Sequence, residues 1–290
     1  MFVPGHLCDA SQESVRGSRG VTRMGHAKRG EGGGEPLLST TRGGILTLTL
    51  NRPAARNALS AGLMDSLQEA LDGIAGDRSV KAVIIAANGP AFCAGHDLKE
   101  LRSKNERAFH EELFARCSRL MITITRLPQP VIARVQGMAT AAGCQLVATC
   151  DLAVASTDAR FATPGVNIGL FCSTPMVALS RAVGRKQAME MLFTGDPIDA
   201  QQAARIGLVN RAVSPDRLDS EVDDLAAKIV GKSGLVVAIG KEAFHNQVEM
   251  DLERAYAYAS RVMTENMLAR DAGEGIDAFL ERRPPRWRDE

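Results

Sequence analysis

A run rich in Val, Ile and Ala at Val80–Ala87 (VKAVIIAA) restricts the fold of this chain more than any other feature. Such a run is typical of a strand buried on both faces of a parallel sheet. Ile45–Leu50 (ILTLTL) alternates apolar residues with Thr and predicts a second strand. Val131–Val135 predicts a third, and two short strands are expected at Leu152–Ala155 and Phe161–Thr163. A sheet of this kind needs helices to cover its faces.

Segments with helical periodicity separate these strands. Ser60 has the side chain of a helix cap, and apolar residues recur every three or four positions over Ala61–Ala75. Further helices are expected near Leu98–Arg126 and in Gly137–Cys150 after its first few residues. From about Pro175 onward the periodicity is helical almost throughout. The alternation predicts an α/β fold with a helical C-terminal region, which a doubly wound sheet satisfies equally well.

Charge and composition exclude several classes of partner. Lys and Arg (35) almost balance Asp and Glu (34) in the 290 residues, so no net positive field attracts nucleic acid or an anionic membrane. Aromatic residues make up only 4%, and no apolar stretch approaches the length of a membrane span. The six cysteines form no CxxC pair, so we expect reduced thiols, no metal site and a cytoplasmic compartment.

Residues 1–38 differ from the rest of the chain. They hold eight glycines, five basic and four acidic residues, and no apolar period, so they are predicted to form a disordered leader. They lack the apolar core of a secretory signal. The basic residues leave a mitochondrial transit peptide open as an alternative, although the acidic residues and the missing amphipathic face argue against it. A start placed too early, with Met24 as the second candidate, explains the segment equally well.

Two segments rich in small residues join a predicted strand to a helix: Ala91–Glu100 (AFCAGHDLKE) and Gly137–Gln145 (GMATAAGCQ). A helix N-terminus presents unpaired N–H groups, and small residues let a ligand approach the backbone. If the two junctions face one another, two N–H donors point at one oxygen and form an oxyanion hole. Tight packing between helix and strand also selects Gly and Ala. Neither segment matches GxGxxG or a P-loop, so a nucleotide-phosphate site gains no support.

Several long motifs resemble the enoyl-CoA hydratase/isomerase (crotonase) family, in the same order and without a large gap from about residue 38 to 287. They are LNRPAARNALS (50–60), AFCAGHDLKEL (91–101), PVIARVQGMATAAGCQLVATCDLAVAS (130–156), FATPGVNIGL (161–170), LFTGDPIDAQQAARIGLVNRAV (192–213) and EGIDAFLERRPPRW (274–287). The resemblance implies a crotonase-like ββα superhelix over residues 39–215 and a helical C-terminal trimerisation region over 216–290. It also implies a homotrimer or dimer of trimers, and a coenzyme A thioester as substrate or ligand rather than a permanently bound cofactor.

The resemblance also implies roles for particular residues. The backbone N–H groups of His96 and Ala142 take the positions of the oxyanion donors. The residues placed along the coenzyme A are Ala55, Arg56, Ala94, Asp97, Leu98 and Lys99. A basic stretch with Arg282, Arg283 and Arg286 can approach a nucleotide phosphate, although a solvated tail is the interpretation that we favour for it.

The chain departs from the family at both positions that carry the hydratase glutamates. Gln145 stands at the first and Gly165 at the second, and neither side chain exchanges a proton near neutral pH. Other family members place an aspartate a few residues further on, where this chain has Ser173, a poor base without help. General acid–base catalysis contributes about 10²–10⁴-fold. We therefore expect weak or absent hydration of crotonyl-CoA.

Other side chains are candidates for the missing proton transfer, each with an ordinary structural alternative. The His96 side chain titrates near neutrality. His110, beside Glu111 and Glu112, belongs to the helix that covers the acyl site in the family, although it also fits a helix surface. Asp97 and Glu100 suit helix capping, and Cys144 and Cys172 suit packing. Gln145 and Asn167 are the best candidates to hold water or a carbonyl group.

Three functions remain open. The first is an acyl-CoA enzyme of fatty-acid metabolism whose chemistry depends mainly on the oxyanion hole. The second is a non-catalytic acyl-CoA binder or regulator, and the third is an enoyl-CoA hydratase with relocated acid and base groups. Fold alone does not choose among them.

Overall fold

The computed structural model describes residues 34–290, so most of the expected leader lies outside the described residues. The strands are β1 (Leu37–Arg42), β2 (Ile45–Leu50), β3 (Ala82–Ala87), β4 (Ala91–Cys93), β5 (Val131–Val135), β6 (Met138–Thr140), β7 (Leu152–Ser156), β8 (Arg160–Ala162), β9 (Ile198–Asp199) and β10 (Arg211–Val213). The α-helices are α1 (Ala61–Asp72), α2 (Leu98–Ser103), α3 (Arg107–Arg126), α4 (Ala142–Thr149), α5 (Pro175–Ala182), α6 (Arg185–Thr194), α7 (Ala200–Arg205), α8 (Leu218–Val230), α9 (Gly234–Gln247), α10 (Leu252–Leu268) and α11 (Arg270–Leu280). Short 3₁₀ turns are η1 (Pro53–Ala55), η2 (Pro164–Ile168) and η3 (Pro215–Arg217).

Two sheets organise the core. The larger has six strands in the order β1-β2-β3-β5-β7-β10, and the smaller has four in the order β4-β6-β8-β9. The strand pairs β3–β4, β5–β6 and β7–β8 each contribute one strand to the large sheet and the next to the small sheet. Within each sheet, the strands from successive pairs lie parallel to one another. This repeated step is the predicted ββα superhelix, and it carries each chain segment from the large sheet to the small one before the next helix.

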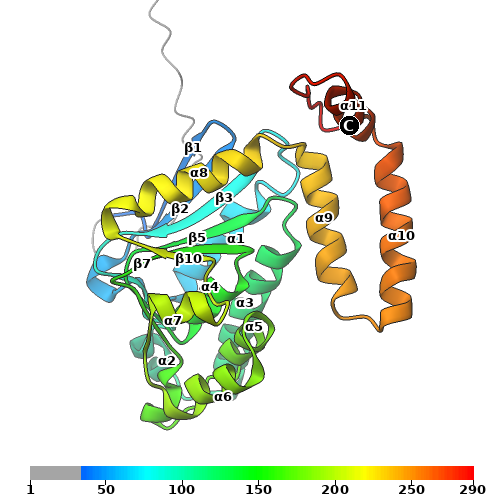
Figure 1. Ribbon diagram of the computed structural model, residues 1–290. Coiled ribbons are helices and arrows are strands. Elements are labelled where there is room, and N and C mark those ends of the chain that lie inside the picture. The colour runs from blue at the N-terminus through cyan, green and yellow to red at the C-terminus, as the bar shows by residue number, and fades with distance from the viewer. Residues whose placement is uncertain (1–33) are drawn as a thin grey trace, which may run out of the picture.

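At β3 the large sheet is buried on both faces, as the Val80–Ala87 run predicted. All six residues of β3 are buried. Ile84 and Ala86 pack with Leu218 and Val222 of α8, which lies across one face (Figure 1). Val83 and Ile85 point into the main core on the opposite face, with α1, α3 and α4. The helix α8 falls within the expected C-terminal region, 216–290, yet its packing makes it part of the core.

The structure differs from the sequence-based expectations in two places. The strand β1 begins at Leu37, inside the segment 1–38 that was expected to be a leader; only Leu37 of its six residues is buried, so no alternation reveals it. Gly43 and Gly44, both at positive φ, close the hairpin from β1 to β2. The helix expected near Leu98–Arg126 is two helices, because the backbone is extended at Lys104.

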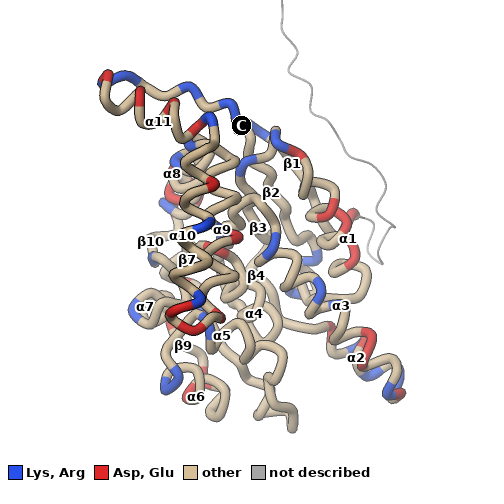
Figure 2. Tube along the Cα trace, turned by 90° about the vertical axis from the view of Figure 1, so that its right-hand side faces the viewer, with Lys and Arg blue, Asp and Glu red and all other residues tan. Residues whose placement is uncertain are grey.

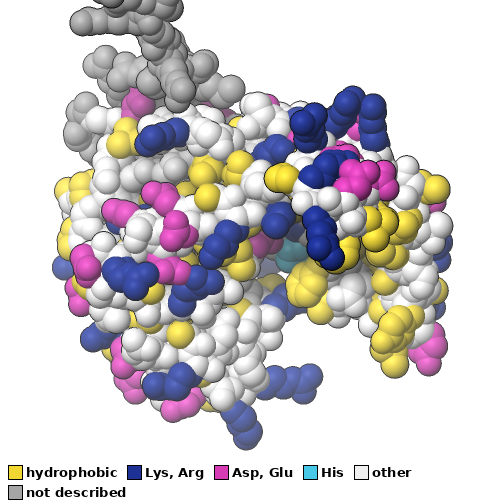
Figure 3. Space-filling view, turned by 45° about the horizontal axis from the view of Figure 1, so that its top comes forward, with side chains coloured by type: hydrophobic (Ala, Val, Ile, Leu, Met, Phe, Trp, Pro, Cys, Tyr) yellow, Lys and Arg dark blue, Asp and Glu magenta, His cyan; other side chains and the backbone are white. Residues whose placement is uncertain are grey.

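The C-terminal helices stand apart from the core. The helices α9 and α10 form a hairpin beside it, and neither helix contains a buried residue (Figure 1). Large apolar side chains on this arm are exposed, including Leu252, Tyr256 and Leu268 at 68–78% (Figure 3). An exposed apolar surface of this kind marks an interaction site. Within residues 34–290, no helix is both long and apolar enough to cross a membrane.

The expectation of a solvated C-terminal tail is wrong for the backbone after α11. The Asp271 carboxylate accepts hydrogen bonds from the N–H groups of Arg288 and Asp289, and the Trp287 indole donates to the Gly231 carbonyl. Asp289 also forms an ion pair with Lys81 of the core at 2.9 Å. These bonds fold the tail back onto the molecule, although the Arg282 and Arg286 side chains remain exposed.

Candidate functional site

The two junctions rich in small residues touch one another. Gly95, between β4 and α2, has φ +88°, and a Cβ atom there would lie 2.9 Å from the Ala141 Cβ and 3.3 Å from the Ala142 nitrogen. Ala141 precedes α4 at φ 50° and ψ −118°, a conformation that a residue with a Cβ adopts only under strain. The sequence placed these segments far apart, and the pairing of β4 with β6 brings them together.

Each junction presents an unpaired backbone donor beside this contact. The Leu59 N–H donates to the Gly95 carbonyl, and the Leu59 carbonyl accepts from the Asp97 N–H, so the intervening His96 N–H points away from Leu59. The Ala142 N–H is the first of α4 and has no acceptor within the helix. No acceptor for either N–H lies among residues 34–290. Two such donors at adjoining helix starts are suited to binding one carbonyl oxygen.

Close packing also constrains these junctions. A Cβ on Gly143 would lie 2.1 Å from the Cys93 carbonyl oxygen, and one on Gly137 would lie 2.2 Å from the Pro90 carbonyl oxygen. Both contacts are too short for any side chain. Close packing therefore explains the glycines at positions 137 and 143 by itself, while the oxyanion role of the two junctions stays a prediction.

Three of the six residues expected along coenzyme A, Ala55, Arg56 and Ala94, lie together. The Ala94 N–H donates to the Arg56 carbonyl at 3.0 Å, which joins Ala94 to the segment that contains Ala55 and Arg56. Arg56 and the next residue, Asn57, both have positive φ. The loop is thus a tight, left-handed turn held against the end of β4.

Asn57 is a supporting residue that the sequence analysis did not identify. Its side chain is fully buried and makes three hydrogen bonds of 2.8 Å: it accepts from the Arg52 N–H and donates to the Asn88 and Ala91 carbonyls. Asn also tolerates the left-handed conformation better than most residues. The sequence feature that could have identified this role is an asparagine directly after a short turn.

The acidic residues after Gly95 have structural partners. Asp97 caps α2, accepting from the Lys99 and Glu100 N–H groups, and forms an ion pair with Arg52 at 3.1 Å. Burial opposes ionisation of Asp97, but the bonds from Arg52 and the N–H groups hold its pKa below the ordinary value. The Glu100 carboxylate accepts from the Ala61 N–H at the start of α1. Leu98 and Lys99, the other two residues expected beside coenzyme A, are exposed.

Gln145 and Gly165 stand at the two positions where the resemblance implies the hydratase glutamates. Gln145 of α4 is 4% exposed and its Oε1 has no hydrogen-bond partner within residues 34–290. Gly165 of η2 is buried, and a Cβ there would lie 2.9 Å from both the Leu170 carbonyl oxygen and the Cys172 Sγ. A glutamate at 165 therefore needs a rearrangement of the 165–172 loop. The helix α4 carries no charged residue at all (Figure 2).

His96 has a half-buried side chain whose ring nitrogens are both buried and unpartnered among the described residues. The ring packs edge-on against Phe114 of α3, with 5.5 Å between centroids. Burial lowers the His96 pKa from its ordinary value, and the nearby Leu59 carbonyl opposes this only partly. His110 lies one turn before Phe114 and therefore on the same face of α3.

The remaining candidates lie on the surface or in the packing. Asn167 and Ser173 are exposed in and after η2, where the Ser173 hydroxyl donates to the Phe171 carbonyl at 3.4 Å. Cys144 and Cys172 are buried; burial raises the pKa of Cys144 to about 12 and also raises that of Cys172. These thiols are packing residues, as expected.

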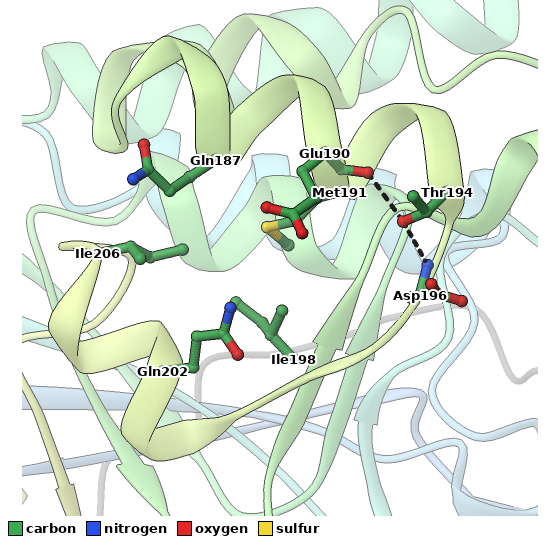
Figure 4. A pocket seen from close by; sticks show the side chains of 8 residues that line it. All are labelled: Gln187, Glu190, Met191, Thr194, Asp196, Ile198, Gln202 and Ile206. Carbon is green, nitrogen blue, oxygen red and sulfur yellow. Dashed lines mark hydrogen bonds between the residues drawn. The ribbon is translucent and has the colours of Figure 1, made fainter.

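Two hollows lie elsewhere on the molecule. One, between α6 and α7, has a volume of about 60 Å³, with Gln187, Glu190 and Gln202 among its lining residues (Figure 4). It has room for only a few water molecules. The other, about 400 Å³, lies at the C-terminal tail, where Glu274 and Arg283 form a bidentate pair across it. Neither hollow is lined by the residues predicted to form the oxyanion hole or by the polar residues predicted near the acyl group.

Comparisons with known proteins identify the family to which the chain is similar. The model of the enoyl-CoA hydratase/isomerase family matches residues 40–290. The chain is 48% identical to enoyl-CoA hydratase domain-containing protein 3, mitochondrial, of Rattus norvegicus, over 93% of this chain and 91% of that protein. A crystal structure of enoyl-CoA hydratase from Mycobacterium smegmatis is 56% identical, with a TM-score of 0.86 over 88% of this chain and 99% of that one. The crystal structure of the human domain-containing protein 3 has a TM-score of 0.85 at 49% identity, over 87% and 100% of the two chains.

Proposed function

Because the chain belongs to the enoyl-CoA hydratase/isomerase family, we propose that it binds a coenzyme A thioester with the carbonyl oxygen between the His96 and Ala142 N–H groups. The observation that carries this proposal is the contact between the two junctions, which places two unpaired donors side by side. The loop of Ala55, Arg56 and Ala94 would lie along the coenzyme A.

Two fixed N–H donors polarise a thioester carbonyl and stabilise negative charge on its oxygen. Because they belong to the backbone of packed junctions, they need little rearrangement when charge develops. Removing one donor of an oxyanion hole typically costs about 10²–10³-fold in rate. A site with two such N–H donors supports enolate chemistry, such as isomerisation, decarboxylation or thioester cleavage, in fatty-acid metabolism.

Hydration of a 2-enoyl thioester needs proton transfer in addition to two N–H donors. Water must lose a proton as it attacks one carbon, and a proton must reach the neighbouring carbon. Gln145 supplies a neutral amide, and Gly165 supplies no side chain. We therefore propose that ordinary hydratase activity is weak or absent. A non-catalytic acyl-CoA binder is the second candidate, favoured by the absence of any charged side chain on α4.

We also propose that the protein is a homotrimer or a dimer of trimers, with the exposed apolar residues of α9 and α10 in the contact between subunits. Apolar surface on this scale is stabilised by burial against a partner. A mitochondrial location, the alternative to the cytoplasmic one, draws support from the names of the rat and human relatives.

Calorimetric titration with acetyl-, crotonyl- and a long-chain enoyl-CoA, followed by mass analysis of each thioester, tests the function. We expect binding, and no gain of water by crotonyl-CoA. A mass gain of water at an ordinary hydratase rate would contradict the proposed loss of proton transfer. Absence of binding for all three thioesters would contradict the acyl-CoA site.

Ala142→Pro removes one donor N–H at the first position of α4, where a proline ring fits a helix. We expect weaker acyl-CoA binding. A thermal melt identifies a variant that has lost its fold, because the strained Ala141 precedes the new proline. Unchanged affinity in a folded variant would remove Ala142 from the oxyanion hole.

A further inference from the structure

The direction of the His96 N–H depends on the residues on either side of it, which both pair with Leu59. The Leu59 N–H donates to the Gly95 carbonyl at 2.8 Å, and the Asp97 N–H donates to the Leu59 carbonyl at 3.2 Å. The His96 N–H lies between these two bonds and points away from Leu59. Because the bond on the Asp97 side is the longer of the two, other contacts that hold Asp97 also determine where this N–H points.

The helix that follows His96, α2, is held to the rest of the molecule mainly by polar contacts. None of its six residues is buried, although Leu101 packs against the core from a partly exposed position, and the helix lies at the edge of the molecule (Figure 2). The Glu100 carboxylate accepts from the Ala61 N–H at 2.9 Å and holds the helix itself. The Asp97 carboxylate holds the residue directly after His96.

Arg52 connects Asp97 to the chain segment on the other side of this pairing. Its Nη2 donates to the Asp97 Oδ2 at 3.1 Å, and its Nη1 donates to the Ala58 carbonyl at 2.7 Å. Ala58 directly precedes Leu59, and Asp97 directly follows His96. One planar guanidinium group therefore bridges both segments of the pairing at the end that carries the His96 N–H.

The position of Arg52 is itself fixed by Asn57, which is fully buried. The Arg52 N–H donates to the Asn57 side chain at 2.8 Å, and the Arg52 carbonyl accepts from the Asn57 N–H at 2.9 Å. The Arg52 and Asp97 side chains are only 28% and 17% exposed, so solvent screens this pair less than a pair on the open surface. A guanidinium binds two acceptors in a fixed geometry, whereas an ammonium is a point charge without this fork.

We propose that Arg52 is a positioning residue of the thioester site: by joining Asp97 to Ala58, it fixes the His96 N–H in the direction of the carbonyl oxygen. The inference rests on the proposed function, in which that N–H is one of two donors to the thioester. The Ala142 donor does not depend on Arg52, because the start of α4 and the pairing of β6 with β8 hold it. Loss of the guanidinium therefore weakens one of the two hydrogen bonds to the carbonyl.

Calorimetric titration of Arg52→Met with acetyl-CoA and with free coenzyme A tests the inference. Free coenzyme A has no thioester carbonyl, so its affinity reports the other contacts of the ligand. We expect the affinity for acetyl-CoA to fall about fivefold, the contribution of one ordinary hydrogen bond, and the affinity for coenzyme A to stay unchanged. Arg116→Met is the matched control, because this arginine of α3 is 26% exposed and pairs with Asp65 of α1 at 2.9 Å; it should change neither affinity.

Asp97→Asn breaks the same contact from the other side and preserves the helix cap. Asparagine caps a helix as well as aspartate does, but with its oxygen directed at the α2 N–H groups, its amide NH₂ faces Arg52. In infrared spectra of bound acetyl-CoA, the carbonyl stretch should move toward that of the free thioester in Asp97→Asn and in Arg52→Met. The double variant should show little additional change, because the two side chains form one contact. A merely structural role would leave the frequency of the bound carbonyl unchanged.

The outcomes separate this inference from the function on which it rests. Equal losses of affinity for acetyl-CoA and coenzyme A in Arg52→Met would overturn the positioning role and indicate a direct contact between the arginine and the ligand. A carbonyl stretch at the wild-type frequency in either variant, with a thermal melt that shows a folded protein, would also overturn it; if Arg52→Met does not fold, Asp97→Asn decides. If the wild-type protein binds neither ligand, the proposed function fails and this inference with it.

Discussion

Replacement of Asn57 by Ala is the most informative test of what holds the loop that we propose to lie along coenzyme A. The fully buried side chain makes three hydrogen bonds of 2.8 Å, and its backbone has φ 54°. Each hydrogen bond contributes about 1 kcal/mol net, and a left-handed alanine costs about 1 kcal/mol more. We therefore expect Asn57→Ala to lower the free energy of unfolding by about 4 kcal/mol.

Urea unfolding followed by circular dichroism measures this loss. Asn57→Gly separates the two contributions, because glycine adopts positive φ without strain, and it should cost about 1 kcal/mol less than alanine. Asn88→Ala is the matched control, since the Asn88 side chain is exposed and makes only one bond, to Asn51; we expect a change of about 0.5 kcal/mol or less. The reasoning is refuted if Asn57→Ala costs no more than this control.

Three further predictions follow from the same structure. Ala141→Gly should raise the free energy of unfolding by about 1 kcal/mol by relieving the strained φ, and a loss in urea unfolding would contradict this. Lys241→Met should cost about 3 kcal/mol in the same assay, because the Asp151 carboxylate loses a buried partner at 2.6 Å, whereas Lys186→Met on the exposed face of α6 should cost almost nothing. Gln145→Glu should raise crotonyl-CoA hydration at least about tenfold, measured as loss of enoyl absorbance; an unchanged rate would contradict the view that a missing carboxylate at position 145 limits hydration.

Strongly patterned elements of the fold could be predicted from the sequence, and weakly patterned ones could not. The run that contains β3 is apolar because both faces are covered, and the family motifs gave the ββα superhelix. β1 was missed because five of its six residues are exposed and a hairpin to β2 holds it. The break between α2 and α3 depends on the backbone at Lys104, and nothing in the local composition marks it.

At the candidate site, too, strongly patterned segments could be predicted from the sequence and individual supporting residues could not. Glycines at strand–helix junctions indicated where two segments would meet, and the close approach of Gly95 to Ala141 agrees with that expectation. Asn57 was missed as a supporting residue, because two of its three hydrogen-bond partners, Asn88 and Ala91, lie more than thirty residues away along the chain. The docked tail after α11 was also missed, since its bonds depend on Asp271 and Lys81, which composition does not connect.

Infrared difference spectroscopy of acetyl-CoA labelled with ¹³C at the thioester carbonyl tests the central claim most directly. If the His96 and Ala142 N–H groups bind the carbonyl oxygen, the carbonyl stretch of bound acetyl-CoA falls below that of the free thioester, and the shift becomes smaller in a folded Ala142→Pro variant. A bound thioester with the stretching frequency of the free one would show that these donors do not contact the carbonyl.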